Sequence, residues 1–297
     1  MIKNIGLPFK LINSFFQVSR IFKGFTPDAV IGVGGYSSFP VLRYAQSRKI
    51  PTFIHESNSF AGKSNIMLGR KATGIFTASD DMQAFFPPDK ITLTGNPVRR
   101  AISHSTISRQ EGLNYFGLAS DKKTLLVVGG SLGARTINEA IDKNLSTLSE
   151  NNLQLIWQTG KPYFERATAA VCGLEGICMS EFISHMEYAY AAADVVISRS
   201  GAMAVAELCL VKKPVVFVPY PFAAEDHQTA NAKALVKKNA ALMISDAAAG
   251  TELIPALLKL VKDEILKNDL SENIAALAVN NADEIIALQI LLQIKKS

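Results

Sequence analysis

The chain has 297 residues, 48% of them hydrophobic and 19% charged, with a formal net charge of +5. This composition is too apolar for a disordered chain, and the length is typical of about two domains. The small positive charge suits an anionic ligand or a membrane surface, but it is too mild to indicate a nucleic-acid-binding protein.

Three cysteines, Cys172, Cys178 and Cys209, lack the spacing of metal ligands, which indicates reduced cytosolic thiols. No apolar run reaches the ~18 residues of a membrane span, and no secretory signal precedes the first domain. We therefore expect a cytoplasmic protein that at most rests on a membrane surface.

The first predicted element is an amphipathic helix over Leu7–Gly24. Its apolar residues are Phe9, Ile12, Phe15, Phe16, Ile21 and Phe22, and its basic residues are Lys10, Arg20 and Lys23. A basic amphipathic helix can lie on anionic lipid headgroups. The alternative is a helix packed on a sheet, and the residues by themselves favour this alternative.

The first half of the chain then alternates strands with helices. Strands are predicted at Asp28–Ile31, Pro51–Ile54, Gly74–Thr77 and Ile91–Leu93, and helices at Phe39–Arg48 and Phe60–Arg70. A glycine-rich turn that includes Gly34, Gly35 and Tyr36 follows the first strand, and its amides can approach an anion closely. The polar cluster His55-Glu56-Ser57-Asn58 follows the second strand, where loops often carry function.

The second half repeats this rhythm after a boundary predicted near residues 102–106. Strands are predicted at Thr124–Val128, Leu153–Gln158, Val195–Ile197, Pro214–Val218 and Ala241–Ile244, with another ending at Phe182-Ile183. The glycine-rich turn Gly129–Arg135 is compatible with a phosphate site, although such a turn alone is weak evidence and lacks a P-loop ending. The pattern predicts two parallel-sheet α/β domains with a cleft between them.

The stretch from Asp194 to Asn231 carries the strongest functional signal. A helix predicted at Ala202–Val211 begins beside the carboxyl end of a buried strand, and its N-terminal amides would attract a phosphate. Glu207, about a turn and a half further on, could accept hydrogen bonds from both ribose hydroxyls. Asp226, His227 and Gln228 would face the same cleft. A structural interpretation, one βαβ unit with a solvated carboxylate, is equally compatible with the spacing.

Seven motifs follow one another along the chain: GVGGYSSFP, HESNSFAGKSN, LTGNPVR, GGSLGAR, EFISHM, SRSGAMAVAE and DHQTAN. In this order they resemble the motifs of the MurG family, the UDP-N-acetylglucosamine transferases that convert lipid I to lipid II. The resemblance covers nearly all of the chain and implies a GT-B fold of two Rossmann-like domains. It implies an acceptor and membrane-side domain at residues 1–103 and a donor domain at 104–297, with the last helix packing back on the first domain.

The resemblance also implies the residues that bind the sugar donor. Arg99 would lie near the donor, Ser131 on its phosphates, and Ile183 would hold the uracil through its backbone. The segment around the diphosphate and ribose would be Ala202, Met203, Ala204, Val205, Ala206 and Glu207. Gln228 and Asn58 would contact the sugar, and Gly34, Gly35 and Tyr36 would form an acceptor or diphosphate loop.

One family motif, the N-terminal GGTGGH loop with its reaction-centre histidine, has no counterpart in this sequence. We therefore expect an incomplete N-terminal domain. Inverting transfer needs a base that takes the acceptor's proton. His55 and Glu56 are the nearest substitutes, and each could equally be a structural hydrogen-bonding residue.

The implied reaction is attack of the muramyl 4-hydroxyl of lipid I on UDP-N-acetylglucosamine, with inversion and departure of UDP. No cofactor and no protein-bound metal are expected, because Asp80-Asp81 is predicted to cap a helix rather than to hold a cation. The implied partners are the two substrates, the anionic inner leaflet of the bacterial membrane and other cell-wall synthesis proteins, without nucleic acid. The implied location is the cytoplasmic face of that membrane, as a peripheral protein.

Two other functions remain open at this stage. One is another GT-B enzyme acting on a UDP-sugar, such as a glycolipid glycosyltransferase or an epimerase. The other is a non-catalytic UDP-sugar-binding remnant, which the missing loop suggests.

Overall fold

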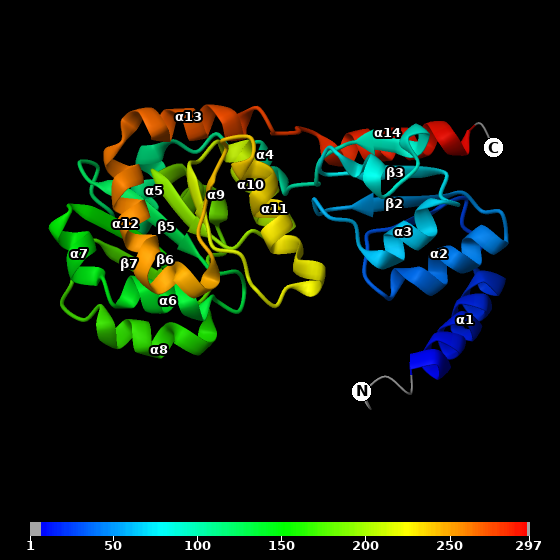
Figure 1. Cartoon of the computed structure of the whole chain (residues 1–297), viewed down its shortest axis with the longest axis horizontal. Helices are drawn as coiled ribbons and strands as arrows, with labels where there is room; N and C mark the ends of the chain where they lie inside the picture. Colours follow the sequence, from blue (N-terminus) through cyan, green and yellow to red (C-terminus); the bar gives the residue numbers. More distant parts are fainter. Residues whose placement is uncertain (1–6, 296–297) are drawn as a thin grey trace. The chain divides into compact units, whose positions relative to one another are not determined.

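The computed structural model of the chain describes residues 7–295 and divides into two compact units (Figure 1). Unit 1 is formed by Met1–Pro97 and Asn281–Ser297, and unit 2 by Val98–Asn280. The predicted boundary at residue 103 and the acceptor and donor roles of the two domains stay predictions.

Unit 1 is built on a four-stranded parallel sheet whose strands lie in chain order, β1–β2–β3–β4. Its elements are α1 (Leu7–Gly24), β1 (Val30–Gly32), α2 (Ser38–Ser47), β2 (Thr52–Glu56), α3 (Lys63–Gly69), β3 (Gly74–Thr77), η2 (Met82–Ala84), η3 (Pro88–Lys90), β4 (Ile91–Leu93) and α14 (Ala282–Ile294). The first strand is short, and the second is buried along its whole length.

Successive side chains of the unit 1 strands point to opposite faces of the sheet. The face bearing Ile54 and Ile75 packs on α2 and α3. The other face bears Phe53 and Phe76, whose rings stack with centroids 5.8 Å apart and are covered by Ile286 of α14. A helix from the far end of the sequence therefore completes this unit, as the ribbon shows (Figure 1).

Unit 2 is built on a six-stranded parallel sheet in the order β7–β6–β5–β8–β9–β10. Its strands are β5 (Lys123–Val128), β6 (Leu153–Gln158), β7 (Ile177–Ser180), β8 (Val195–Ser198), β9 (Val215–Phe217) and β10 (Leu242–Met243). In chain order this is the 3-2-1-4-5-6 arrangement of the dinucleotide-binding fold. The chain builds outward from β5 in one direction and from β8 in the other.

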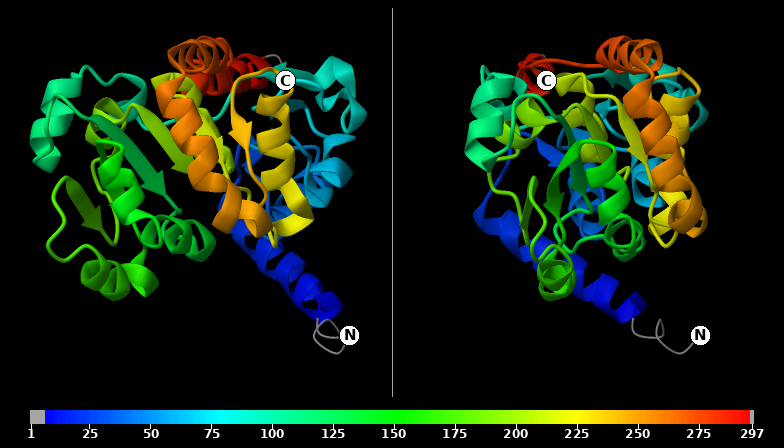
Figure 2. Two further views of the ribbon diagram at one scale, coloured as in Figure 1. Left: turned by 60° about the vertical axis from the view of Figure 1, so that its left-hand side comes forward. Right: turned by 90° about the vertical axis from the view of Figure 1, so that its left-hand side faces the viewer.

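Helices cover both faces of this sheet, so its strands lie between two layers (Figure 2). One face carries α6 (Arg135–Asp142), α7 (Leu145–Glu150), α8 (Lys161–Ala170) and α12 (Ala249–Lys262). The other carries α4 (Arg100–Ser103), α5 (Arg109–Phe116), α9 (Met186–Ala192), α10 (Ala202–Val211) and α11 (His227–Val236). The remaining elements are η4 (Ala224–Asp226), η5 (Asp246–Ala248) and α13 (Glu264–Ala275).

The predicted alternation of strands and helices is confirmed, with local differences at some ends. The helices at Leu7–Gly24 and Ala202–Val211 coincide with the predicted ranges. The strand predicted to end at Phe182-Ile183 ends at Ser180 instead, and β2 continues through Glu56 rather than ending at Ile54. Within residues 7–295, no helix is both long and apolar enough to span a bilayer.

Candidate functional site

The reversal of strand order between β5 and β8 defines the candidate site of unit 2. In open parallel sheets, ligands bind outside the carboxyl ends of the strands at such a reversal. The turn Gly129–Ala134 follows β5, and the turn Arg199–Gly201 follows β8 and leads into α10. Ser131 is exposed in the first turn, and Gly201 is the N-cap residue of α10. The fold thus places the predicted phosphate loop beside the helix predicted to bind the diphosphate.

Close backbone contact fixes the turn after β5. Gly133 and Gly160 both have positive φ, and a Cβ atom on Gly133 would lie 2.1 Å from the carbonyl oxygen of Thr159. Glycine is therefore required where the turns after β5 and β6 meet. The Asn138 amide adds a second tie by donating to the same Thr159 carbonyl at 2.7 Å.

Gln158, at the end of β6, connects the phosphate loop to the predicted uracil site. Its amide nitrogen donates to the Gly130 carbonyl at 2.9 Å, and its amide oxygen accepts from the Ile183 backbone N–H at 2.9 Å. Since the N–H of Ile183 is already occupied, its carbonyl is the backbone group left for a base. The sequence analysis did not single out Gln158, because its role depends on neighbours that only the sheet order brings together.

Glu207 is the largely buried carboxylate of the site, with a side chain 13% exposed. Its Oε2 accepts a hydrogen bond from the Tyr190 hydroxyl at 2.8 Å, and its Oε1 lies 3.6 Å from the Arg99 guanidinium. Burial raises the pKa of Glu207 above its ordinary value, while the Tyr190 hydrogen bond and the Arg99 charge oppose that shift. The structure thus brings two predicted residues, Arg99 and Glu207, together, and adds a tyrosine that the sequence analysis missed.

Gln228, the predicted sugar contact, lies in the first turn of α11. Its side-chain oxygen accepts from the Tyr220 N–H at 2.9 Å, and its backbone carbonyl accepts from Ser200 Oγ at 2.8 Å. Glu225 and Asp226, directly before this helix, both adopt the left-handed conformation. These bonds orient Gln228 with its amide NH₂ as the group left for a ligand.

Arg199 ties together the turns after β8 and β9. Its guanidinium donates to the Val218 and Pro219 carbonyls at 2.9 and 3.0 Å and pairs with Asp246. A second nitrogen reaches Thr136 of α6 at 3.3 Å. This largely buried cation holds the carboxyl ends of β8 and β9 against α6, and the sequence analysis did not predict its role.

The predicted catalytic pair of unit 1 is buried at the end of β2, not exposed in a loop. His55 is 4% exposed, with Nε2 3.0 Å from the Gly95 carbonyl oxygen and Nδ1 3.3 Å from Ser57 Oγ. Since a carbonyl can only accept, Nε2 carries the proton and Nδ1 accepts from the Ser57 hydroxyl. Both nitrogens are occupied, which supports the structural alternative for His55, and its catalytic role stays a prediction.

Glu56 is 3% exposed and accepts hydrogen bonds on both oxygens. The donors are the backbone N–H groups of Asn58 and Gly62 and the side-chain amides of Asn58 and Asn65, at 2.8–3.4 Å. A carboxylate surrounded in this way fastens the segment between β2 and α3. The same bonds direct the Asn58 amide toward Glu56, so its predicted contact with the sugar also stays a prediction.

The glycine-rich turn after β1 is open to solvent. Gly34 and Gly35 have φ values of 95° and 78°, and Tyr36 is 83% exposed.

Asp81 is the N-cap residue of the short 3-10 helix η2, but its side chain makes no capping hydrogen bond. The predicted position of Asp81 at the start of a helix is therefore confirmed, but the predicted cap is wrong for its side chain, which forms no capping hydrogen bond from a left-handed backbone conformation.

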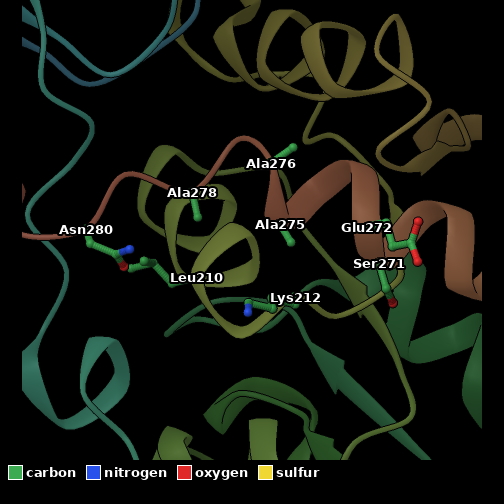
Figure 3. Close-up of a pocket in the computed structure, with 8 residues that line it drawn as sticks. All are labelled: Leu210, Lys212, Ser271, Glu272, Ala275, Ala276, Ala278 and Asn280. Atoms are coloured by element: carbon green, nitrogen blue, oxygen red, sulfur yellow. The ribbon is translucent and has the colours of Figure 1, made fainter.

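A shallow pocket of about 620 Å³ opens on unit 2 between α10 and α13 (Figure 3). It is lined by Leu210, Lys212, Ser271, Glu272, Ala275, Ala276, Ala278 and Asn280. None of the predicted donor residues lines this pocket, so it is separate from the candidate donor site.

Comparison with known families matches both halves of the chain. Residues 124–288 match the glycosyltransferase family 28 C-terminal domain, and residues 1–77 match its N-terminal domain. The protein of Phocaeicola vulgatus named UDP-N-acetylglucosamine--N-acetylmuramyl-(pentapeptide) pyrophosphoryl-undecaprenol N-acetylglucosamine transferase is 48% identical over 98% of this chain and 78% of its own length. The protein of the same name from Parabacteroides distasonis is 46% identical over 96% and 78%.

Among solved structures, Acinetobacter baumannii MurG is similar with a TM-score of 0.76 and 30% identity, over 98% of this chain and 79% of that one. The UDP complex of S. aureus MnaA has a TM-score of 0.71 at 18% identity, over 96% and 80%. The second similarity shows a shared fold and nothing more. Together these neighbours confirm the predicted GT-B class of two parallel-sheet, Rossmann-like domains.

Proposed function

The chain belongs to the UDP-N-acetylglucosamine–N-acetylmuramyl-(pentapeptide) pyrophosphoryl-undecaprenol N-acetylglucosamine transferases, within glycosyltransferase family 28, and on that premise we propose its reaction. It transfers N-acetylglucosamine from UDP-N-acetylglucosamine to the muramyl 4-hydroxyl of lipid I, giving lipid II. The single observation that carries this proposal is 48% identity to such a transferase over 98% of the chain.

The donor nucleotide binds unit 2 at the carboxyl ends of β5 and β8. The Ile183 carbonyl accepts from the uracil, and Glu207 accepts hydrogen bonds from the ribose hydroxyls. Ser131 and the amides at the start of α10, from Ala202 onward, face the diphosphate. Gln228 offers its NH₂ to the sugar. The strand-order reversal and the buried, partly paired carboxylate of Glu207 support this arrangement.

Arg99 is the exposed cation of this site, with a side chain 56% exposed. Its guanidinium lies 3.6 Å from Glu207 and is exposed enough to contact the diphosphate of the donor. As the bond to the anomeric carbon breaks, negative charge grows on the leaving UDP. A cation and oriented amides already in place lower the free energy of that transition state.

α1 supplies the surface that we assign to the membrane. Phe9, Ile12 and Phe16 are 74%, 55% and 70% exposed and share one face of the helix, opposite the buried Val18. The exposed cations Arg20 and Lys23 continue this face toward the C-terminal end. An apolar stripe that ends in basic residues suits the boundary of an anionic leaflet, and it supports our proposal of a peripheral protein on the cytoplasmic face of the membrane.

The deciding experiment is transfer of labelled N-acetylglucosamine from UDP to a lipid I analogue by this 297-residue chain. We expect formation of the disaccharide lipid, and its loss in a Glu207→Ala variant. UDP binding without transfer above background would favour the non-catalytic remnant. Conversion of the donor sugar without any acceptor would instead indicate an epimerase.

A further inference from the structure

Tyr190 is buried next to the candidate ribose site but belongs to a different helix from Glu207. It lies in α9, is 4% exposed, and its hydroxyl donates to Glu207 Oε2 at 2.8 Å. Burial and the neighbouring carboxylate raise the pKa of Tyr190 well above its ordinary value, so the hydroxyl keeps its proton and acts as a donor. The two carboxylate oxygens of Glu207 therefore have unlike partners, one a buried phenol and the other an exposed cation.

We propose that Tyr190 is a positioning residue for nucleotide recognition, which holds Glu207 Oε2 so that Oε1 faces the ribose hydroxyls. This inference rests on the proposed function and deepens it. The Arg99 side chain on Oε1 is 56% exposed and can leave when a nucleotide arrives, whereas Tyr190 cannot move without disturbing the core. Tyr190 thus fixes Oε2, whereas Oε1 can exchange the Arg99 cation for the ribose hydroxyls.

The position of Tyr190 also connects the base and ribose parts of the site. Ile183, whose backbone is assigned to the uracil, precedes α9 by a few residues, and both Ile183 and Tyr190 lie in the same buried cluster. The Tyr190 ring fills space that a phenylalanine ring would fill equally well. A Tyr190→Phe substitution therefore removes the hydrogen bond and little else.

A matched control exists elsewhere in unit 2. Tyr163 is 8% exposed and donates to Asp142 Oδ2 at 2.7 Å, while Arg166 pairs with the same carboxylate at 2.9 Å. This is the same set of tyrosine, carboxylate and arginine, but on α6 and α8 and outside the nucleotide assignment. Tyr163→Phe should lower stability by a similar amount and leave nucleotide selection unchanged.

The experiment compares the dissociation constants of UDP and 2′,3′-dideoxy-UDP by calorimetry on the full chain and both variants. The wild type should bind UDP about 10-fold or more tightly than the dideoxy analogue, because the analogue has no ribose hydroxyls to donate to Glu207 Oε1. In Tyr190→Phe this preference should fall to about 2-fold or less, while the affinity for the analogue stays within about 2-fold of wild type. Tyr163→Phe should keep the full preference.

Each other outcome overturns a specific statement. Equal weakening of both nucleotides in Tyr190→Phe would make Tyr190 a packing residue only, and a preference that survives in this variant would remove its role entirely. A wild type that binds both nucleotides equally would overturn the ribose assignment of Glu207. A wild type that binds neither would overturn the proposed function itself.

Discussion

The Glu56 carboxylate accepts hydrogen bonds from groups that all follow it in the chain, up to Asn65 in α3. Hydrogen bonds to a charged acceptor are stronger than neutral ones, and a donor left unpaired in a buried place pays its desolvation cost. These hydrogen bonds give Glu56 a structural role, which an experiment can distinguish from a catalytic one. Stability and turnover, measured on the same variant, distinguish the two roles.

We expect Glu56→Gln to lower the free energy of unfolding by about 2–4 kcal/mol, because the amide NH₂ would face donors where a carboxylate oxygen now accepts. Urea unfolding of both proteins measures this difference. Asp89→Asn, at an exposed carboxylate of unit 1, should change stability by less than about 0.5 kcal/mol. A Glu56→Gln protein of full stability and no turnover would instead assign Glu56 to catalysis.

If Glu207 binds the ribose as we propose, UDP binding should depend on pH. Burial raises its pKa, so its ionised fraction falls as the solution is acidified through that raised value. Arg99 lowers the same pKa by favouring the charged form. We expect Arg99→Ala to move the acidic loss of UDP affinity to higher pH, measured by titrations across the mildly acidic range.

Glu207→Gln is the reference for that measurement. The pH dependence that remains in this variant belongs to the phosphates of the nucleotide and should be subtracted from the other curves. An acidic limb that is the same in the wild type and in Arg99→Ala would contradict the coupling between these two side chains.

The residues that the sequence pattern could and could not predict differ in the range of their contacts. Glu207 was predicted because it follows a strand end by a fixed helical spacing. Tyr190, Gln158 and Arg199 were missed because their partners come from elements brought together only by the sheet order. Local sequence carries little information about which strand will lie beside which.

At the scale of elements, the hydrophobic periodicity predicted the bounds of a strand or helix well where strong turn residues flank it. The strands at Gly74–Thr77 and Leu153–Gln158 coincide with their predicted ranges. The error at β2 has a physical reason: His55 and Glu56 are polar, so the pattern ended the strand before them. Their burial is stabilised by hydrogen bonds that no hydrophobic pattern reveals.

α1 allows a direct test of the membrane assignment. Phe9→Ser with Phe16→Ser should weaken binding to vesicles containing anionic lipid by about 10-fold or more, because two exposed rings no longer enter the interface. Sedimentation of the protein with such vesicles measures this. Leu288→Ser, at an exposed leucine of α14, is the control and should bind as wild type. Unchanged binding of the double variant would remove α1 from the membrane surface.

The contact between the turns after β5 and β6 predicts a large effect from one methyl group. Gly133→Ala would force its Cβ atom against the Thr159 carbonyl, in a backbone conformation with φ of 74°. Gly117→Ala has a similar φ of 64° but open space around it. We expect Gly133→Ala to cost about 1–3 kcal/mol more than Gly117→Ala in thermal unfolding. Equal costs would mean that the turn shifts freely.

At the scale of the whole molecule, each unit has its own hydrophobic clusters, and the chain passes from one unit to the other twice. A core substitution in unit 1 should therefore leave nucleotide binding by unit 2 intact.

The GT-B class itself was predicted from the motifs, whose order along the chain identifies the family more specifically than any single element.

Ile286→Ala tests this independence, because Ile286 is 8% exposed and packs on Phe53 and Phe76. We expect unit 1 to lose about 2–4 kcal/mol of stability while the UDP affinity of the folded protein stays within about 2-fold. Leu288→Ala, at a position 60% exposed on the same helix, should have little effect on either. A matching loss of UDP affinity in Ile286→Ala would show that the units are coupled.

The return of α14 to unit 1 also sets the timing of folding during protein synthesis. The stacked rings of Phe53 and Phe76 leave the ribosome long before Ile286 is made. At ordinary elongation rates, the intervening chain takes roughly 10–40 s to synthesise. Unit 2 can fold during that interval, whereas the face of the unit 1 sheet that bears Phe53 and Phe76 stays exposed until α14 has been synthesised. The four-stranded sheet of unit 1 is therefore translated before unit 2 but completed after it, and it is the part that a nascent-chain chaperone would protect.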